Sequence, residues 1–121
     1  MGVIIDCNQR AILNLKNSLF RLFYSHIIKI IEDTNIILPI SVESLIDKLQ
    51  MGGYGLGTDI AKYLYNYNDT LIFSRIVREA IETTEKNYPG LVDPAKISLW
   101  NFHKEIEEYA QELKNKEIQT K

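Results

Sequence analysis

This chain of 121 residues contains one cysteine and three prolines, and its basic residues do not outnumber its acidic ones. These shortages exclude several protein classes. The lone Cys7 has no second cysteine with which to form an internal disulfide, so we expect a reducing compartment. The 14 lysines and arginines are outnumbered by 16 aspartates and glutamates, which gives a net charge of −2. Such a chain has no bulk positive field with which to gather nucleic acid, so we expect no direct nucleic-acid partner.

Long uninterrupted hydrophobic runs are also missing. The most apolar stretch, residues 11–31, is interrupted by Lys16, Arg21, His26 and Lys29. These charged and polar side chains argue against a membrane span, so we expect no membrane partner. The first ten residues lack the basic start, apolar run and small-residue cleavage site of a secretion signal. We therefore expect a cytoplasmic protein.

Hydrophobic residues make up 45% of the chain, which is enough for a core that needs no disulfide or metal. The sequence contains no internal repeat, low-complexity tract or interdomain linker. We predict a single helical domain over residues 1–121, with a frayed tail from about residue 115.

The stretch from Ala11 to Ile31 carries the strongest structural signal. Its polar residues recur three or four positions apart, which places them on one narrow stripe of an α-helix. These are Asn14, Ser18, Arg21, Ser25 and Lys29. The rest is mostly apolar, so we predict a central helix, over about residues 8–32, that is covered on several sides. The preceding Val3–Ile5 run is too short to distinguish a strand from an apolar lead-in.

Turn-forming and helix-capping residues divide the remainder of the chain into further helices. The capping residues are Ser41, Thr58, Asp69 or Thr70, and the pair Asp93–Pro94. They predict helices over about residues 42–51, 59–66, 71–87 and 94–114. The predicted fold class is therefore all-α, a compact bundle of about five helices around a central hydrophobic N-terminal helix.

The histidines and the cysteine do not form a recognisable catalytic or metal-binding pattern. His26 lies within the predicted central helix and is expected to be packed or half-exposed. His103 precedes Glu107 by four residues, a spacing more typical of an ion pair than of a catalytic dyad. No Glu-x-x-His pair suits a di-iron bundle, and no Cys/His spacing suits zinc. We predict that the protein is not an enzyme and holds no metal or cofactor.

The glycine-rich loop GGYGLG, residues 52–57, holds four of the six glycines. It leads toward a predicted helix N-terminus, where anions often bind. No clear strand precedes it, however, no Gly-Lys-Ser/Thr follows, and Asp59 would repel a phosphate. A structural loop or a partner-recognition loop around Tyr54 is therefore favoured over a nucleotide site.

Tyrosines and acidic residues supply the candidate binding surface. Tyr63, Tyr65 and Tyr67 point in different directions around a helix axis, so at least one should be exposed, and tyrosine is frequent at protein interfaces. Acidic residues form two groups, each of which is either a solvated helix face or a docking face for a basic partner. The predicted partner-binding residues are Tyr54, Asp59, Tyr63, Tyr65, Tyr67, Glu79, Glu82 and Glu85. The rival surface is the acidic side of the last helix, around Glu105, Glu108 and Glu112.

A broader pattern combines the chain's size, its helix-rich single domain and the run LPISVESLIDKLQMGGYGLGTDIAKYL, which leads into another helix. Over about residues 38–113 this pattern resembles the small helical immunity proteins of bacterial toxin–immunity pairs, especially those of contact-dependent growth inhibition. The resemblance implies a cytoplasmic protein that binds one cognate toxin domain and blocks its active site or substrate access. Many such toxins are nucleases, whose phosphate-binding surfaces are basic, so an acidic inhibitor face would complement them.

Two other functions remain open at this point. One is a helical adaptor or regulatory protein of phage or plasmid origin. The other is a small-ligand protein that uses the Gly52–Gly57 loop.

Overall fold

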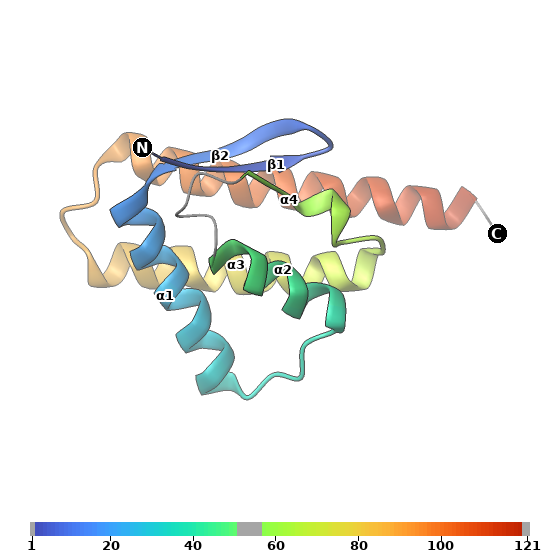
Figure 1. Cartoon of the computed structure of the whole chain (residues 1–121), viewed down its shortest axis with the longest axis horizontal. Coiled ribbons are helices and arrows are strands. Elements are labelled where there is room, and N and C mark those ends of the chain that lie inside the picture. Colours follow the sequence, from blue (N-terminus) through green and yellow to red (C-terminus); the bar gives the residue numbers. More distant parts are fainter. Residues whose placement is uncertain (1, 51–56, 120–121) are drawn as a thin grey trace.

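The computed structural model describes residues 2–50 and 57–119 and shows a mixed α+β fold (Figure 1). In chain order its elements are β1 (Gly2–Cys7), β2 (Arg10–Lys16), α1 (Asn17–Thr34), α2 (Ile40–Gln50), β3 (Thr58–Asp59), the 3-10 turn η2 (Ile60–Lys62), α3 (Tyr67–Asn87) and α4 (Asp93–Gln119). Helix accounts for 71% and strand for 13% of the described structure. The predicted all-α bundle of about five helices is therefore wrong, although helix does predominate.

The N-terminal hairpin is the main departure from the prediction. Residues 8–16 were expected to begin the central helix, but β1 and β2 pair antiparallel from Gly2↔Lys16 to Cys7↔Arg10. Asn8 and Gln9 have φ angles of 53° and 69°, which is the positive-φ pair that a two-residue hairpin turn requires. The Val3–Ile5 run is thus part of a strand, with both end residues buried against the core.

An irregularity in the hairpin explains why the sequence of β2 resembles a helix. The register shifts between Ile5 and Asp6, so that Ile12 has no partner in the ladder. Ile12 and its neighbour Leu13 are both buried, which breaks the strict alternation expected of a strand. Consecutive buried apolar residues fit a helix as well as a bulged strand. The helical pattern of the residues that follow therefore extends back through Ile12 and Leu13 in the sequence.

The predicted helix over residues 59–66 is also replaced. Thr58 and Asp59 pair in parallel with Ile5 and Asp6 of β1, which completes a sheet of order β2-β1-β3. Asp59 has an extended backbone, and its carboxylate accepts a hydrogen bond from the N–H of Ala61 at the start of η2. Only one 3-10 turn follows before the chain leaves helical geometry.

The remaining helices match the sequence signals more closely. Helix α2 is confirmed within two residues at its start, and α4 begins at Asp93 as its Asp–Pro boundary predicts. The cap of α3 is Asn66, whose side chain accepts from the N–H of Asp69, so this helix begins four residues earlier than expected. Helix α4 continues to Gln119, beyond the predicted end at residue 114.

Helix α3, rather than the N-terminal helix, occupies the centre of the fold. It lies alongside α4, α1 crosses it, and the hairpin lies along α4 (Figure 1). Eight residues of α3 are buried, compared with four of α1. The expected hub around α1 is therefore corrected to α3, whose residues pack against the other helices. No helix of residues 2–50 and 57–119 is both long and apolar enough to cross a bilayer.

Phe23 on α1 provides a test of this packing. Its ring is 1% exposed and makes edge contacts with Phe20 and with Phe102 of α4. We expect Phe23→Ala to lower the free energy of unfolding by about 3–5 kcal/mol, because a fully buried aromatic leaves a cavity. Ile37→Ala is the control, since Ile37 is 95% exposed and its loss should cost less than about 0.5 kcal/mol. Urea unfolding followed by circular dichroism measures both, and equal losses would contradict the assigned core.

Candidate functional site

The described members of the predicted partner-binding set fall in separate places. Tyr54 lies outside the described residues, as does the glycine loop apart from Gly57. Tyr67 is the first residue of α3, whereas Glu79 lies 12 residues further along the same helix. At 1.5 Å per residue this corresponds to about 18 Å along the axis. The tyrosines and the α3 acids therefore do not form one cluster.

The three described tyrosines differ in their exposure. Tyr65 is 71% exposed, and its hydroxyl donates to the carbonyl of Lys62. Tyr63 is half-buried and packs against the core. Tyr67 is half-buried as well, with the ammonium of Lys114 5.2 Å from its ring centroid, which is a cation–π distance. Of these three, Tyr65 presents the exposed ring.

Asp59 has a structural role, because its carboxylate joins three segments of the backbone. Its carboxylate accepts hydrogen bonds from the backbone N–H groups of Asn8 (3.0 Å), Gln9 (2.8 Å) and Ala61 (2.9 Å). These bonds connect the hairpin turn to β3 and η2. The hairpin turn lies about 50 residues away in sequence, and no local motif signals the contact.

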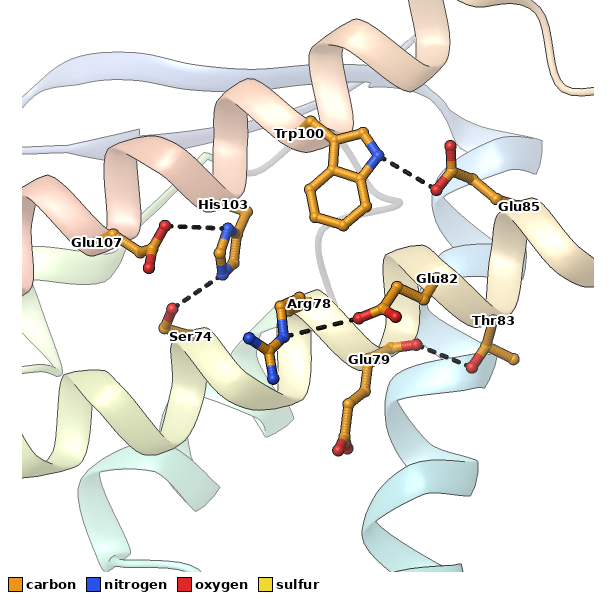
Figure 2. A network of polar contacts seen from close by, with 9 residues as sticks. All are labelled: Ser74, Arg78, Glu79, Glu82, Thr83, Glu85, Trp100, His103 and Glu107. Atoms are coloured by element: carbon orange, nitrogen blue, oxygen red, sulfur yellow. Dashed lines mark hydrogen bonds and ion pairs between the residues drawn. The ribbon is translucent and has the colours of Figure 1, made fainter.

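The acids of α3 lie beside a cleft between α1 and α3. Glu79 and Glu82 line this cleft of about 360 Å³, together with Asp33, Ile30 and two threonines. Glu82 is paired with Arg78 at 3.6 Å, and Glu85 instead accepts a hydrogen bond from the indole N–H of Trp100 at 3.2 Å (Figure 2). Arg78 thus offsets the negative charge of Glu82, and the carboxylate of Glu85 helps to join α3 to α4.

The rival acidic surface forms a groove between the hairpin and α4. We call it the hairpin groove; its volume is about 230 Å³. It is lined by Cys7, Asn8, Arg10, Glu105, Glu108, Tyr109 and Glu112. The glutamates are spaced three and four residues apart, so successive turns of α4 bring them to one side. Arg10 pairs with Glu105, which leaves an excess of negative charge along the groove.

Two buried side chains underlie the hairpin groove. Burial, together with the nearby carboxylates of Asp59 and Glu112, raises the pKa of the Cys7 thiol to about 11, so the thiol stays protonated near neutral pH. Burial likewise raises the pKa of Tyr109 to about 12, and its hydroxyl donates to the carbonyl of Leu64 at 2.7 Å. Tyr65 follows Leu64, so this hydrogen bond brings the backbone at Tyr65 close to Tyr109, although Tyr65 does not itself line the groove.

A polar array joins α3 to α4 on another side of the molecule (Figure 2). The Nε2 atom of His103 lies 3.2 Å from the Ser74 hydroxyl, and its Nδ1 atom lies 3.4 Å from Glu107. The His103–Glu107 contact confirms the ion-pair spacing seen in the sequence. Ser74 was missed because it is 29 residues away and carries no motif.

Ser74, His103 and Glu107 have the order hydroxyl, imidazole, carboxylate that is found in enzymes with a nucleophilic serine. Ser74, however, lies well inside α3 and is only 4% exposed. Backbone N–H groups inside a helix are bonded to carbonyls four residues back, so they do not form an oxyanion hole beside this hydroxyl. The geometry favours a structural or binding role over nucleophilic catalysis.

His26 is packed, in agreement with the sequence-based expectation. Its Nδ1 atom lies 2.7 Å from the Thr84 hydroxyl, which itself donates to the carbonyl of Ala80. A hydroxyl has one proton to donate, so His26 donates its Nδ1 hydrogen to Thr84. The contact joins α1 to α3.

Comparisons of the chain with protein-family models, with curated proteins and with solved structures give no match. Within the described ranges, no three His, Cys, Asp or Glu residues are grouped in a way that could hold a metal ion. The functional argument therefore rests on the surfaces described above.

The Asp59 contacts lead to a stability prediction. We expect Asp59→Ala to lower the free energy of unfolding by about 1–3 kcal/mol, because three backbone donors lose a charged acceptor. Asp69→Ala offers a comparison at an N-terminal helix turn, with a smaller expected loss. Chemical unfolding of both variants provides the measurement. An Asp59→Ala variant as stable as the wild type would contradict the bridging role.

The two buried histidines predict a pH dependence. Burial lowers the pKa of His26, assisted by Lys29, and burial also lowers the pKa of His103, although Glu107 acts in the opposite direction. The folded state therefore binds fewer protons than the unfolded state below the usual histidine pKa. We expect the free energy of unfolding to fall as the pH decreases from about 7 to about 5.

Urea titrations across this range test the histidine effect. His26→Gln and His103→Gln should each flatten the pH dependence, because a glutamine does not titrate. A dependence of the same steepness in the double variant would show that other groups cause it.

Proposed function

We propose that this protein is an immunity protein that binds and neutralises a cognate bacterial toxin domain through the hairpin groove. The observation that carries the proposal is the line of Glu105, Glu108 and Glu112 along this groove. The exposed Tyr65 directly follows Leu64, whose carbonyl accepts a hydrogen bond from the groove residue Tyr109. In this proposal the protein acts in the cytoplasm by covering the toxin's active site or substrate surface. It uses no cofactor and does not itself contact nucleic acid.

The chemistry of the groove supports a basic protein partner. A toxin that cleaves transfer RNA or DNA needs lysines and arginines to hold phosphates. Carboxylates arranged along a groove attract such a surface, speed its association and disfavour acidic partners. An exposed tyrosine ring beside the charges offers the aromatic anchor that often dominates interface energy.

The hairpin groove is a better candidate than the cleft between α1 and α3. The cleft has two α3 glutamates, one of them paired with Arg78, whereas the groove has three glutamates of α4, one of them paired with Arg10. The exposed Tyr65 precedes the first residue of α3, far along the axis from Glu79 and Glu82. At the hairpin groove, the Tyr109–Leu64 hydrogen bond brings aromatic and acidic groups together. This combination is the reason for preferring the hairpin groove as the binding surface.

A helical adaptor or regulator of phage or plasmid origin is the alternative, and it would use the same surface on a different protein. Co-purification from the native host, followed by mass spectrometry, distinguishes the two by the identity of the captured protein. A basic toxin domain encoded by a neighbouring reading frame supports immunity. Capture of an unrelated regulator, without such a toxin, contradicts it.

Charge reversal at the groove is the sharpest test with a toxin domain in hand. We expect Glu108→Lys to slow association and reduce its salt dependence, because Glu108 is exposed and contributes to the attractive field. We expect Tyr65→Ala to weaken binding by about 1–3 kcal/mol, mainly through faster dissociation. Surface plasmon resonance at two salt concentrations measures both effects.

Glu82→Lys is the matched control, since it reverses one exposed glutamate on α3 instead of α4. It should bind the toxin like the wild type. If Glu82→Lys loses binding while Glu108→Lys retains it, the cleft between α1 and α3 is the binding surface.

A further inference from the structure

We propose that a pocket between α3 and α4 binds a small oxyanion of the phosphate type. The pocket has a volume of about 160 Å³ and is lined by Leu71, Ser74, Arg75, Arg78, His103 and Glu107. This space is large enough for one tetrahedral oxyanion. The proposal is independent of toxin binding, because it concerns different residues.

Two arginines give the pocket permanent positive charge. Arg75 and Arg78 are three residues apart on α3, a spacing that places them on neighbouring turns of one side. Within the described residues Arg75 forms no ion pair, and Arg78 approaches Glu82 only through its Nε atom, at 3.6 Å. Guanidinium groups present several N–H donors in a planar fork that matches phosphate oxygens.

The Ser74–His103 contact supplies two further donors when an anion enters. The carboxylate of the exposed Glu107 lies 3.4 Å from Nδ1 of His103, and this negative charge favours the tautomer with the hydrogen on Nδ1. In the free protein the Nε2 atom then accepts from the Ser74 hydroxyl. Protonation of Nε2 would turn this atom into a donor and release the hydroxyl, so that both groups could donate to the same oxyanion.

Anion binding and proton uptake are therefore coupled at His103. The charged groups that face this imidazole are Glu107 on its own helix, and Arg78 and Glu82 on α3. Burial keeps the pKa of His103 below its ordinary value in the free protein. A bound anion stabilises the imidazolium, so sulfate, whose charge does not change in this range, should bind more tightly near pH 6 than near pH 8.

Trp100 offers a direct readout of the pocket. It is the chain's single tryptophan, and its ring packs edge-to-face on His103 with centroids 5.9 Å apart. We would titrate the full chain with sodium phosphate at constant ionic strength, following both tryptophan fluorescence and the heat of binding. A saturable change that sodium chloride does not reproduce is the expected result.

Variants separate the pocket from general surface charge. Arg75→Gln and Arg78→Gln should each weaken phosphate binding by about tenfold, the usual effect of losing one charged hydrogen bond. Arg21→Gln is the control, since Arg21 is an exposed arginine on α1, and it should bind phosphate like the wild type. His103→Gln should fold normally by circular dichroism and lose the pH dependence of sulfate binding.

Three outcomes would overturn the proposal. The first is the absence of saturable phosphate binding. The second is unchanged affinity in both pocket-arginine variants. The third is acetate binding as tightly as phosphate and sulfate, which would exclude preference for a tetrahedral oxyanion. Since none of these measurements involves a toxin, their failure is distinguishable from failure of the immunity proposal.

Discussion

The carboxylate of Asp59 connects the N-terminal hairpin to the second half of the chain. The positive φ angles of Asn8 and Gln9 set a tight turn, and both turn N–H groups donate to this one side chain. The same carboxylate accepts from Ala61, so it also initiates η2. Since β3 contributes only two residues to the sheet, these charged hydrogen bonds are a large share of the polar contacts that hold the hairpin in place. The position of Asn8 at the rim of the hairpin groove follows from them.

Helix α4 separates two pockets of different charge, one lined by three glutamates and Arg10 and the other by two arginines and Glu107. Glu105, Glu108 and Glu112 lie beside the hairpin, whereas His103 lies toward α3 and its arginines. The net charge of −2 hides this division, because it averages acidic and basic groups over the whole chain. Charge patterning within a fold therefore carries more functional information here than the overall balance does.

Local signals in the sequence predicted α2, α3 and α4, but they missed the hairpin and predicted a helix over residues 59–66 that the structure does not have. The Asp93–Pro94 boundary of α4 depends on adjacent residues, so it is readable from sequence. The turn at Asn8 lacks the glycine usual in such hairpins, and its stabilising acceptor is far away in sequence.

The candidate site likewise has one part that is readable from the sequence and one part that is not. Its acids were visible as a helical pattern, but the placement of Tyr65 beside them depends on a tertiary hydrogen bond.

Buried polar contacts define how the helices pack around α3. Apolar packing is strong but non-directional, so it specifies burial better than helix register. His26 bonds to Thr84 on one side of α3, and His103 bonds to Ser74 toward α4. A shift of either neighbouring helix by one residue would break its contact and leave a buried polar group unsatisfied, which is costly. These two contacts therefore favour one alignment of the three helices. That alignment is what brings the α3 arginines and His103 of α4 to a common pocket.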